Sequence, residues 1–594
     1  MSPIRLLIFD ILFPDIHGRW REVEINWFLT HPAFETDVLI YPHATSWIPN
    51  QDIVQSFKTY YDAYPHLNNY HILIFNPKFN CLNQFNRTID GTKYNGCQFG
   101  DYLLTRRPIL NLSQYDIGYA IFLHTWLQNY QLINRRLWPM ITKIYPGGGI
   151  YHHNQQQIKT YLTVMNKNNE AIIVTQPLLF ELTMRQIAKV HKIYGLPLLD
   201  AGTQIRRKTM TQVQSLDICF YAIGAHPKKG FHNYVKLINH LGQNYPDAQI
   251  RFHIVGYTLP ADFKLPSNAI YHKVMAPRQL DNFLYEVIDI VVTPVIKFND
   301  PDGFPLNAEA MLQGCIPIQT DPYQSNSHYQ FSDLEGLFLN EFNLDTMTAF
   351  ILRLYHNRSL RQAMSHRIID KVVSLFSPSA QLEPIVRIMQ HEIFEYQLPR
   401  LLRSIPTDEI GGCLLTDALQ FGHLILNHKL KSLAEIGVWR GRSLAALTLA
   451  SRLNDGQVYA IDPYTADNLR QFDSTDRVKS IIESSLAKMN LDQVYQETQS
   501  LFSKSEHVHV LRLTSSQALH QMPVLDLLHI DGNHDTDCVE ADMQNYLPKV
   551  RAAGFIILNA SDWPSVRLAI SHLMKSAKLV EDHARWQLWQ KNLL

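Results

Sequence analysis

A short stretch near the middle of the chain holds two acids and a glycine around a predicted turn and the start of a predicted helix. Asp302, Gly303 and Phe304 begin a predicted tight turn, and Glu309 follows in the first turn of a predicted helix. The start of a helix presents backbone N–H groups to acceptor oxygens, and the helix dipole favours a glutamate there. The stretch therefore predicts a site for phosphate or sugar hydroxyls. The alternative is an ordinary turn and helix start.

Two lysines upstream could neutralise a phosphorylated leaving group. Lys228 and Lys229 follow the predicted strand 216–221 and precede Gly230 and a predicted helix. Positive charge beside a helix N-terminus suits a diphosphate group. A solvated turn with two lysines is the alternative interpretation.

These motifs resemble the donor-binding signature of retaining glycosyltransferases with the two-domain GT-B architecture. The resemblance implies a nucleotide-sugar donor, with Glu309 on its ribose, Asp302 on its sugar hydroxyls and Lys229 on its diphosphate. Two features depart from the family pattern. Six residues, not seven, separate Asp302 from Glu309, and Ala225 occupies the position of the family's arginine.

The first 210 residues contain further candidates. Short apolar runs alternate with helical stretches, which predicts parallel strands in a doubly wound domain. Ligands collect at the carboxyl ends of such strands, where His124 follows the run 120–123 and Gly18 follows the first strand. The GT-B resemblance implies that His124 faces the transferred sugar and Gly18 helps to form the cleft floor. A strand-end histidine and a simple loop are the alternatives.

A third set of motifs begins after a predicted linker near residue 404. Residues 433–443 read as a strand, a glycine turn and a helix, and the next predicted strand ends in an acid. An acid so placed can bind the two ribose hydroxyls of an adenosine cofactor, either NAD or S-adenosylmethionine. The candidate cofactor-binding residues in this pattern are Gly437 and Gly441 in the turn and Asp462 at the strand end.

Three motifs in this region resemble class I S-adenosylmethionine-dependent methyltransferases. They are Glu-Ile-Gly-Val at 435–438, Ile-Asp-Pro at 461–463 and Ile-Asp-Gly-Asn-His at 530–534. The resemblance implies that the cofactor-binding residues Glu435, Gly437 and Ser443 line the methionine side and that Asp462 holds the ribose. It also implies the roles of the third motif's polar residues: Asp531 beside the methyl group, and His534 as the acceptor-side base.

Several relatives in that family bind a divalent metal through the aspartate of Ile-Asp-Gly and a later acidic pair, and hard oxygen ligands suit Mg²⁺. In this chain Asn559 and Ala560 occupy the positions of the pair. Asp562 is nearby but out of register. Three alternatives follow: the metal is lost, Asp562 joins Asp531 as a ligand, or the domain transfers no methyl group.

Length and composition set the limits of these hypotheses. The chain has 594 residues, enough for several domains. Lys+Arg and Asp+Glu number 54 each, which argues against a strongly basic nucleic-acid surface. Six scattered cysteines without paired spacing favour the cytoplasm. No apolar stretch predicts a membrane span, so membrane contact would be peripheral, at the inner face, and nothing indicates an oligomeric state.

We therefore predict an α/β protein of three Rossmann-like doubly wound units. They are a GT-B acceptor-side domain at 1–212, a GT-B nucleotide-sugar-binding domain with a crossing helix at 213–403, and a class I methyltransferase domain at 404–594. The resemblances imply a bifunctional enzyme that transfers a sugar to a glycan or glycolipid with retention and O-methylates a sugar. The alternatives are a non-catalytic scaffold, or a glycosyltransferase whose C-terminal domain is regulatory or non-methylating.

Overall fold

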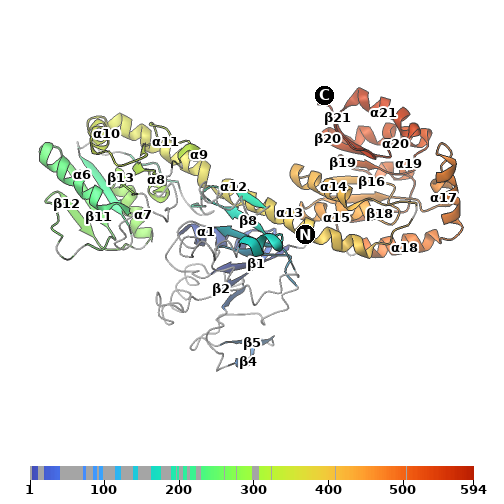
Figure 1. Cartoon of the computed structure of the whole chain (residues 1–594), viewed down its shortest axis with the longest axis horizontal. Helices are drawn as coiled ribbons and strands as arrows, with labels where there is room; N and C mark the ends of the chain where they lie inside the picture. Colours follow the sequence, from blue (N-terminus) through green and yellow to red (C-terminus); the bar gives the residue numbers. More distant parts are fainter. Residues whose placement is uncertain are drawn as a thin grey trace. The chain divides into compact units, whose positions relative to one another are not determined.

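The computed structural model forms two compact units, Pro3–Val386 and Arg387–Leu594 (Figure 1). Each is described by itself. The described residues are 3–10, 19–40, 71–74, 84–89, 92–97, 114–121, 138–144, 162–175, 189–195, 197–199, 205–209, 215–222, 229–259, 261, 263–275, 277–296, 307–322, 324, 326–408, 410–503 and 505–593.

The first unit begins with a parallel sheet in the order β3-β2-β1-β6-β7-β8-β9. Its central strands β6, β7 and β8 are fully buried, as expected where helices cover both faces. Their bounds are β1 Ile4–Asp10, β2 Phe34–Ile40, β3 His71–Ile74, β6 Ile117–Ala120, β7 Met140–Ile144, β8 Ala171–Val174 and β9 Val190–Lys192. The helix α1 (Arg19–Thr30) lies between β1 and β2, and β4 (Gln84–Ile89) and β5 (Thr92–Cys97) form an antiparallel hairpin.

A second parallel sheet in the same unit has the order β12-β11-β10-β13-β14-β15. Apolar side chains of α6 and α10 pack on one face of this sheet, and those of α7 and α8 pack on the other. The strands are β10 Leu216–Tyr221, β11 Ile250–Val255, β12 Ala269–His272, β13 Ile290–Thr293, β14 Ile316–Thr320 and β15 Leu337–Leu339. The helices are α6 Phe231–Asn244, α7 Pro277–Glu286, α8 Ala308–Leu312, α9 Asn326–Tyr329, α10 Leu344–His356, α11 Arg358–Phe376 and α12 Pro378–Gln381.

The segment predicted to cross back to the first domain contains α12 and α13 (Glu383–Ser404). Gln381 donates a hydrogen bond to the carbonyl of Tyr194, which lies just after β9. The amide of Leu198 donates to the carbonyl of Phe376 at the end of α11. Hydrogen bonds therefore join the segment at the end of α11 and in α12 to the residues that follow β9, the last strand of the first sheet.

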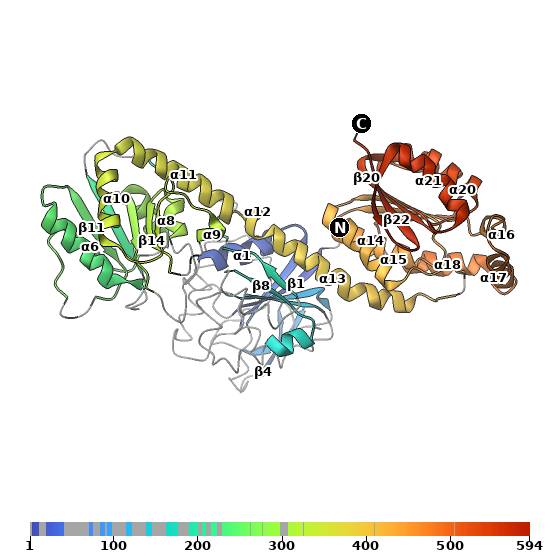
Figure 2. The same cartoon turned by 45° about the horizontal axis from the view of Figure 1, so that its top comes forward.

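The second unit contains a sheet in the order β18-β17-β16-β19-β20-β22-β21. The first five strands are parallel, and β22 runs antiparallel to β20 and β21. Helices α14 and α15 lie on one side of this sheet, and α20 and α21 on the other (Figures 1 and 2). The strands are β16 Ser432–Ile436, β17 Gln457–Ile461, β18 Val508–Leu511, β19 Leu525–Ile530, β20 Val550–Asn559, β21 Ala577–Asp582 and β22 Trp586–Lys591. The helices are α14 Leu415–His428, α15 Arg442–Leu453, α16 Ala466–Leu469, α17 Asp476–Leu486, α18 Leu491–Phe502, α19 Ser515–Ala518, α20 Thr536–Tyr546 and α21 Pro564–Ser576.

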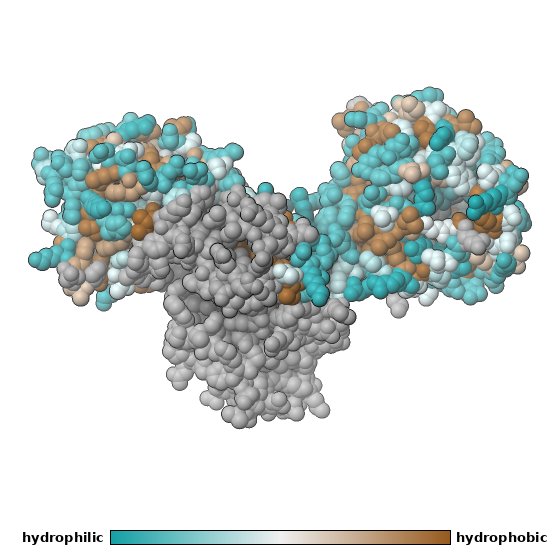
Figure 3. Space-filling model, viewed as in Figure 1, coloured by the Kyte–Doolittle hydropathy of each residue, from teal (hydrophilic) through white to brown (hydrophobic). Residues whose placement is uncertain are grey.

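These sheets confirm the predicted α/β class with Rossmann-like parallel sheets. The predicted boundaries near residues 212 and 403 stay predictions. In the part of the chain described, no helix has the length and apolar character needed to span a membrane. The drawn face of the second unit is mostly hydrophilic, interrupted by smaller hydrophobic patches (Figure 3).

Candidate functional site

A cavity of about 410 Å³ lies in the second unit, where the strand order reverses between β16 and β19. These strands are parallel neighbours, with Ile436 opposite Ile530, so the loops that follow them meet at one edge of the sheet. Doubly wound sheets bind ligands at this position, and the volume suits a small molecule. Much of the lining comes from the segments 410–413, 437–443, 462–463, 514–516, 531–534 and 538–542.

Two glycines shape the turn between β16 and α15. Gly437 has φ of 86°, and a Cβ added there would lie 2.1 Å from the carbonyl oxygen of Asp531. Gly441 has φ of 80°, and its Cβ would lie 2.5 Å from the ring of Phe502. A side chain at either position would be strained and would collide with its neighbours. The absence of a side chain at Gly437 therefore lets the turn pack directly against the loop after β19.

The predicted ribose-binding residue, Asp462, lies in the cavity wall and is only 8% exposed. Its Oδ2 accepts the backbone N–H groups of Val438 (3.0 Å) and Trp439 (2.9 Å), and its Oδ1 accepts that of Tyr464 (2.8 Å). Burial raises the pKa of Asp462, while these amide donors act in the opposite direction. Asp462 thus holds the glycine turn in place, and ribose binding stays a prediction.

Glu435 lies beneath the cavity and is not among the residues that line it. Its Oε1 lies 2.9 Å from Nδ1 of His529, and both side chains are almost fully buried. Burial raises the pKa of Glu435. Burial acts to lower the pKa of His529, but the hydrogen bond and charge of Glu435 outweigh burial, so the pKa of His529 is raised. Ser443 is 5% exposed, lines the cavity and hydrogen-bonds Glu435. Glu435 therefore lies behind the cavity wall, where Ser443 and Asp531 are among the lining residues that act on it.

Asp531 and His534 lie together on the cavity wall, as the third motif predicts. Nε2 of His534 is 3.5 Å from Oδ1 of Asp531, and the histidine ring packs 5.0 Å from that of Trp563, centroid to centroid. Asn559 donates its side-chain N–H to the same Asp531 oxygen. Burial acts to raise the pKa of Asp531, but these partners outweigh it and hold the pKa below its usual range. Asp531 is therefore ionised at neutral pH.

The residues present do not fit a magnesium site. The described part of the chain holds no group of three or more His, Cys, Asp or Glu side chains that could ligate a metal ion. Asn559 presents an amide N–H donor to Asp531, whereas Mg²⁺ requires oxygen ligands. Asp562 is exposed and is not among the cavity-lining residues. The predicted pairing of Asp531 with Asp562 is not seen.

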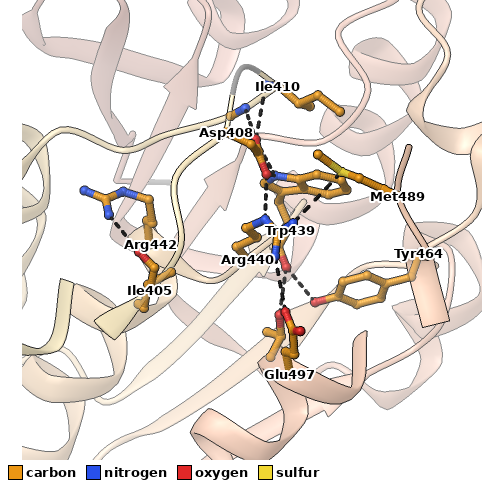
Figure 4. A network of polar contacts seen from close by, with 11 residues as sticks. Ile405, Asp408, Ile410, Trp439, Arg440, Arg442, Tyr464, Met489 and Glu497 are labelled. Atoms are coloured by element: carbon orange, nitrogen blue, oxygen red, sulfur yellow. Dashed lines mark hydrogen bonds and ion pairs between the residues drawn. The ribbon is translucent and has the colours of Figure 1, made fainter. Parts of the chain in front are cut away.

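A network of polar contacts outside the predicted motifs connects the segment before α14 to the glycine turn, which is the loop between β16 and α15 (Figure 4). Asp408 accepts hydrogen bonds from Nε1 of Trp439 (3.1 Å) and Nε of Arg440 (2.6 Å), and from the backbone N–H of Ile410 (3.1 Å). Arg440 also pairs with Glu497 at 3.3 Å. Trp439 has φ of 51°, a strained conformation for a residue with a side chain. Asp408 therefore stabilises the turn that carries the predicted glycines.

Sequence reasoning missed Asp408 because it lies 31 residues from Trp439 and belongs to no local motif. The Gly411-Gly412-Cys413 segment that follows it lines the cavity. Arg442 donates to the carbonyl of Cys413 at 3.2 Å, which fixes this segment to the start of α15. The only signal in the sequence was the glycine pair after a predicted linker.

In the first unit, the second sheet also reverses its strand order, between β10 and β13. Lys229 and Gly230 precede α6, and Gly230 has φ of 73° with its Cβ position 1.7 Å from the carbonyl of Pro294, just after β13. Glu309 lies in the first turn of α8. Burial raises the pKa of Tyr221, at the end of β10, and the negative charge of Glu309 raises this pKa further. The structure thus brings Lys229 and Glu309 to the carboxyl-end edge of this sheet, where ligand binding by these residues stays a prediction.

Several predicted residues lie outside the described part of the chain. They are Gly18, His124, Lys228, Asp302, Gly303 and Phe304.

Solved structures similar to the chain include a glycosyltransferase and an O-methyltransferase. A UDP complex of TarM from S. aureus is 11% identical, covers 66% of this chain and 100% of its own, and has a TM-score of 0.45. A glycosyltransferase from Rickettsia africae is 13% identical, with coverages of 66% and 99% and a TM-score of 0.43. The O-methyltransferase NovP is 16% identical, with coverages of 36% and 100% and a TM-score of 0.27.

No curated protein matches the sequence. Residues 434–560 match the family model of a methyltransferase domain. This range begins within β16, extends past the end of β20 and contains most of the cavity wall. The match identifies a methyltransferase domain in the C-terminal part of the chain, as its motifs predict.

Proposed function

We propose that the C-terminal domain binds S-adenosylmethionine in the 410 Å³ cavity and methylates a sugar hydroxyl. The match to the methyltransferase-domain family model carries this proposal. The cavity supports it, because it lies at the reversal of strand order and beside a glycine turn. Gly437, Gly441 and Ser443 would hold the methionine side, and Asp462 the ribose.

The sulfonium supplies an already activated methyl group, so the protein has to orient the acceptor and remove its proton. His534 would accept the proton from the acceptor hydroxyl. Asp531, 3.5 Å away and ionised, would stabilise the imidazolium that forms. Asn559 keeps the Asp531 carboxylate oriented by donating to it. This route needs no metal ion.

For residues 1–403 we propose a retaining transfer of a hexose-like sugar from a nucleotide sugar to a glycan or glycolipid. The support is the all-parallel sheet with Lys229 and Glu309 at its ligand-binding edge. Lys229 would neutralise the leaving diphosphate, which then assists attack on the same sugar face, and Glu309 would bind the donor ribose. His124 and Asp302 keep the roles that the resemblance implies.

We also propose that the enzyme works in the cytoplasm, at the inner face of the membrane if its acceptor is a glycolipid. The buried thiols of Cys219 and Cys315 are free, which suits a reducing compartment.

The test is to assay both transfers with the full-length chain and two variants. His534→Ala should lower methyl transfer by roughly 10²–10⁴-fold, the usual contribution of a general base, and leave sugar transfer unchanged. Glu309→Ala should abolish sugar transfer and leave methyl transfer unchanged. If either variant removed both activities, the two-site proposal would be wrong. Absence of both activities in the unmodified chain would favour the scaffold alternative.

A further inference from the structure

The segment between β17 and α17 carries a cavity-lining residue that contacts the proposed base. Gln471 lies in this segment, just after α16, and its side-chain Nε2 is 3.3 Å from Nδ1 of His534. Asp531 lies at the other ring nitrogen, with its Oδ1 3.5 Å from Nε2 of His534. The imidazole of His534 therefore has an amide at one nitrogen and a carboxylate at the other.

Hydrogen bonds on both sides of Gln471 hold this residue opposite His534. The carbonyl of Arg470, the residue before it, accepts the side-chain N–H of Asn533 at 2.8 Å. The backbone N–H of the residue after it donates to the carboxylate of Asp535 at 2.9 Å. Because Asn533 and Asp535 are the two neighbours of His534 in the chain, the pairing of the two segments brings Gln471 and His534 together.

Two buried atoms of this pair have no hydrogen-bond partner among the residues that the structure describes. They are Oε1 of Gln471 and Nε2 of His534. Leaving buried polar atoms unpaired costs free energy, so such atoms call for a reason. In the structure the amide nitrogen of Gln471 faces Nδ1. A half-turn of the amide exchanges its nitrogen and oxygen and brings Oε1 to Nδ1, where it can accept an N–H.

The direction of this hydrogen bond decides which nitrogen of the neutral ring carries the proton. With the amide oxygen at Nδ1, the proton is on Nδ1, and Nε2 keeps a free electron pair beside Asp531 on the cavity wall. With the amide N–H donated to Nδ1, the proton is on Nε2, and neither ring nitrogen can take a proton from an acceptor. The two directions therefore have opposite consequences for a base at His534.

We propose that Gln471 is a positioning residue for methyl transfer, whose side-chain oxygen accepts the Nδ1–H of His534 and leaves Nε2 free to take the acceptor's proton. This inference rests on the proposed function. The hydroxyl proton moves to Nε2, the freed electron pair on oxygen bonds the methyl carbon, and the pair of the broken C–S bond stays on sulfur. The imidazolium then has an N–H at each nitrogen, and Asp531 and Gln471 are the acceptors facing them.

The test measures kcat and KM for methyl transfer by the full-length chain, with methyl glycosides of common hexoses as acceptors. Gln471→Glu offers only acceptor oxygens and should keep most of kcat. Gln471→Met offers no amide and should lower kcat by roughly 10–10²-fold, part of the contribution of a general base, with KM for S-adenosylmethionine unchanged. Gln499→Met is the matched control: this exposed glutamine of α18 does not line the cavity, so kcat should not change.

An unchanged kcat in Gln471→Met would overturn the inference. A loss in Gln471→Glu as large as that in Gln471→Met would do the same, because it would show that the amide N–H, not the oxygen, is what His534 needs.

A second readout does not depend on turnover. Long-range ¹H–¹⁵N spectra of the full-length chain with labelled histidines report which ring nitrogen carries the proton, and the signals absent from His534→Ala identify His534. We expect the neutral ring of His534 to carry its proton on Nδ1. A proton on Nε2 would overturn the inference whether or not methyl transfer is found. Failure of the chain to bind S-adenosylhomocysteine in calorimetry would instead overturn the proposed function.

Discussion

Asp462, Asp531 and Asp542 share one cavity wall, yet their surroundings push their pKa values in different directions. Asp531 is held below its usual range by its partners, whereas burial raises the pKa of Asp462 and Asp542. The sequence predicted the first two from motifs. It could not predict the exposure or partners of Asp542, because these depend on how α20 packs against the loop after β18.

The raised pKa of Asp542 makes a prediction about stability and pH. Between its ordinary pKa of 3.8 and about 6 the folded protein holds a proton that the unfolded chain has released, so stability falls as pH rises through this window. Asp542→Asn removes this titration. At pH 7.5 the variant's C-terminal domain should be more stable by up to about 3 kcal/mol, and near pH 4 the gain should disappear.

Thermal unfolding of the ligand-free full-length chain at the two pH values measures this effect. Glu540→Gln, a control on the same helix α20, should show no such pH-dependent gain. A gain that is equal at both pH values, or larger in acid, would contradict the assigned cause.

Among the secondary-structure elements, the buried parallel strands were predictable because they are dominated by apolar residues: the run is unbroken in β8 and interrupted by few polar residues in β10 and β19. The pair β21 and β22 was missed. Five of the six residues of β21 are exposed, so it lacks an apolar run. Its antiparallel pairing with β22 depends on tertiary packing.

The glycine turn after β16 offers a test of close packing between elements. Gly437→Ala should destabilise the C-terminal domain by more than the roughly 1–2 kcal/mol that positive φ costs a residue with a Cβ, because the methyl group also meets the Asp531 carbonyl. Gly412→Ala is the control, since its Cβ position has nothing within 4 Å. Equal melting temperatures for the two variants would show that the turn is not packed as described.

A buried ion pair ties α1 to the first sheet. Nζ of Lys143 on β7 lies 2.6 Å from Oε2 of Glu24, both side chains are fully buried, and the hydroxyl of Tyr119 donates to the other Glu24 oxygen. Lys143→Met should cost about 3–5 kcal/mol in a denaturant titration, because it leaves Glu24 buried without its cation. Adding Glu24→Leu to that variant should restore part of the loss. A double variant less stable than Lys143→Met would argue that Glu24 is satisfied without the lysine.

At the scale of the whole molecule, the sequence predicted parallel α/β sheets and a methyltransferase domain from the order of its motifs. It did not predict the division into two compact units at Val386 and Arg387, which falls inside α13. The helix α13 continues through that point, so no break in secondary structure marks it. Asp408 was missed for a related reason, since its partners in the glycine turn are distant in sequence.

The central claim is that one chain carries a nucleotide-sugar site and an S-adenosylmethionine site. The most direct test is the melting temperature of the full-length protein with S-adenosylmethionine and with a panel of nucleotide sugars. A ligand at 100 times its Kd stabilises its domain by about 2.7 kcal/mol. We expect S-adenosylmethionine and at least one nucleotide sugar each to raise a melting transition, and together to raise both. Stabilisation by neither would contradict the account and favour a scaffold.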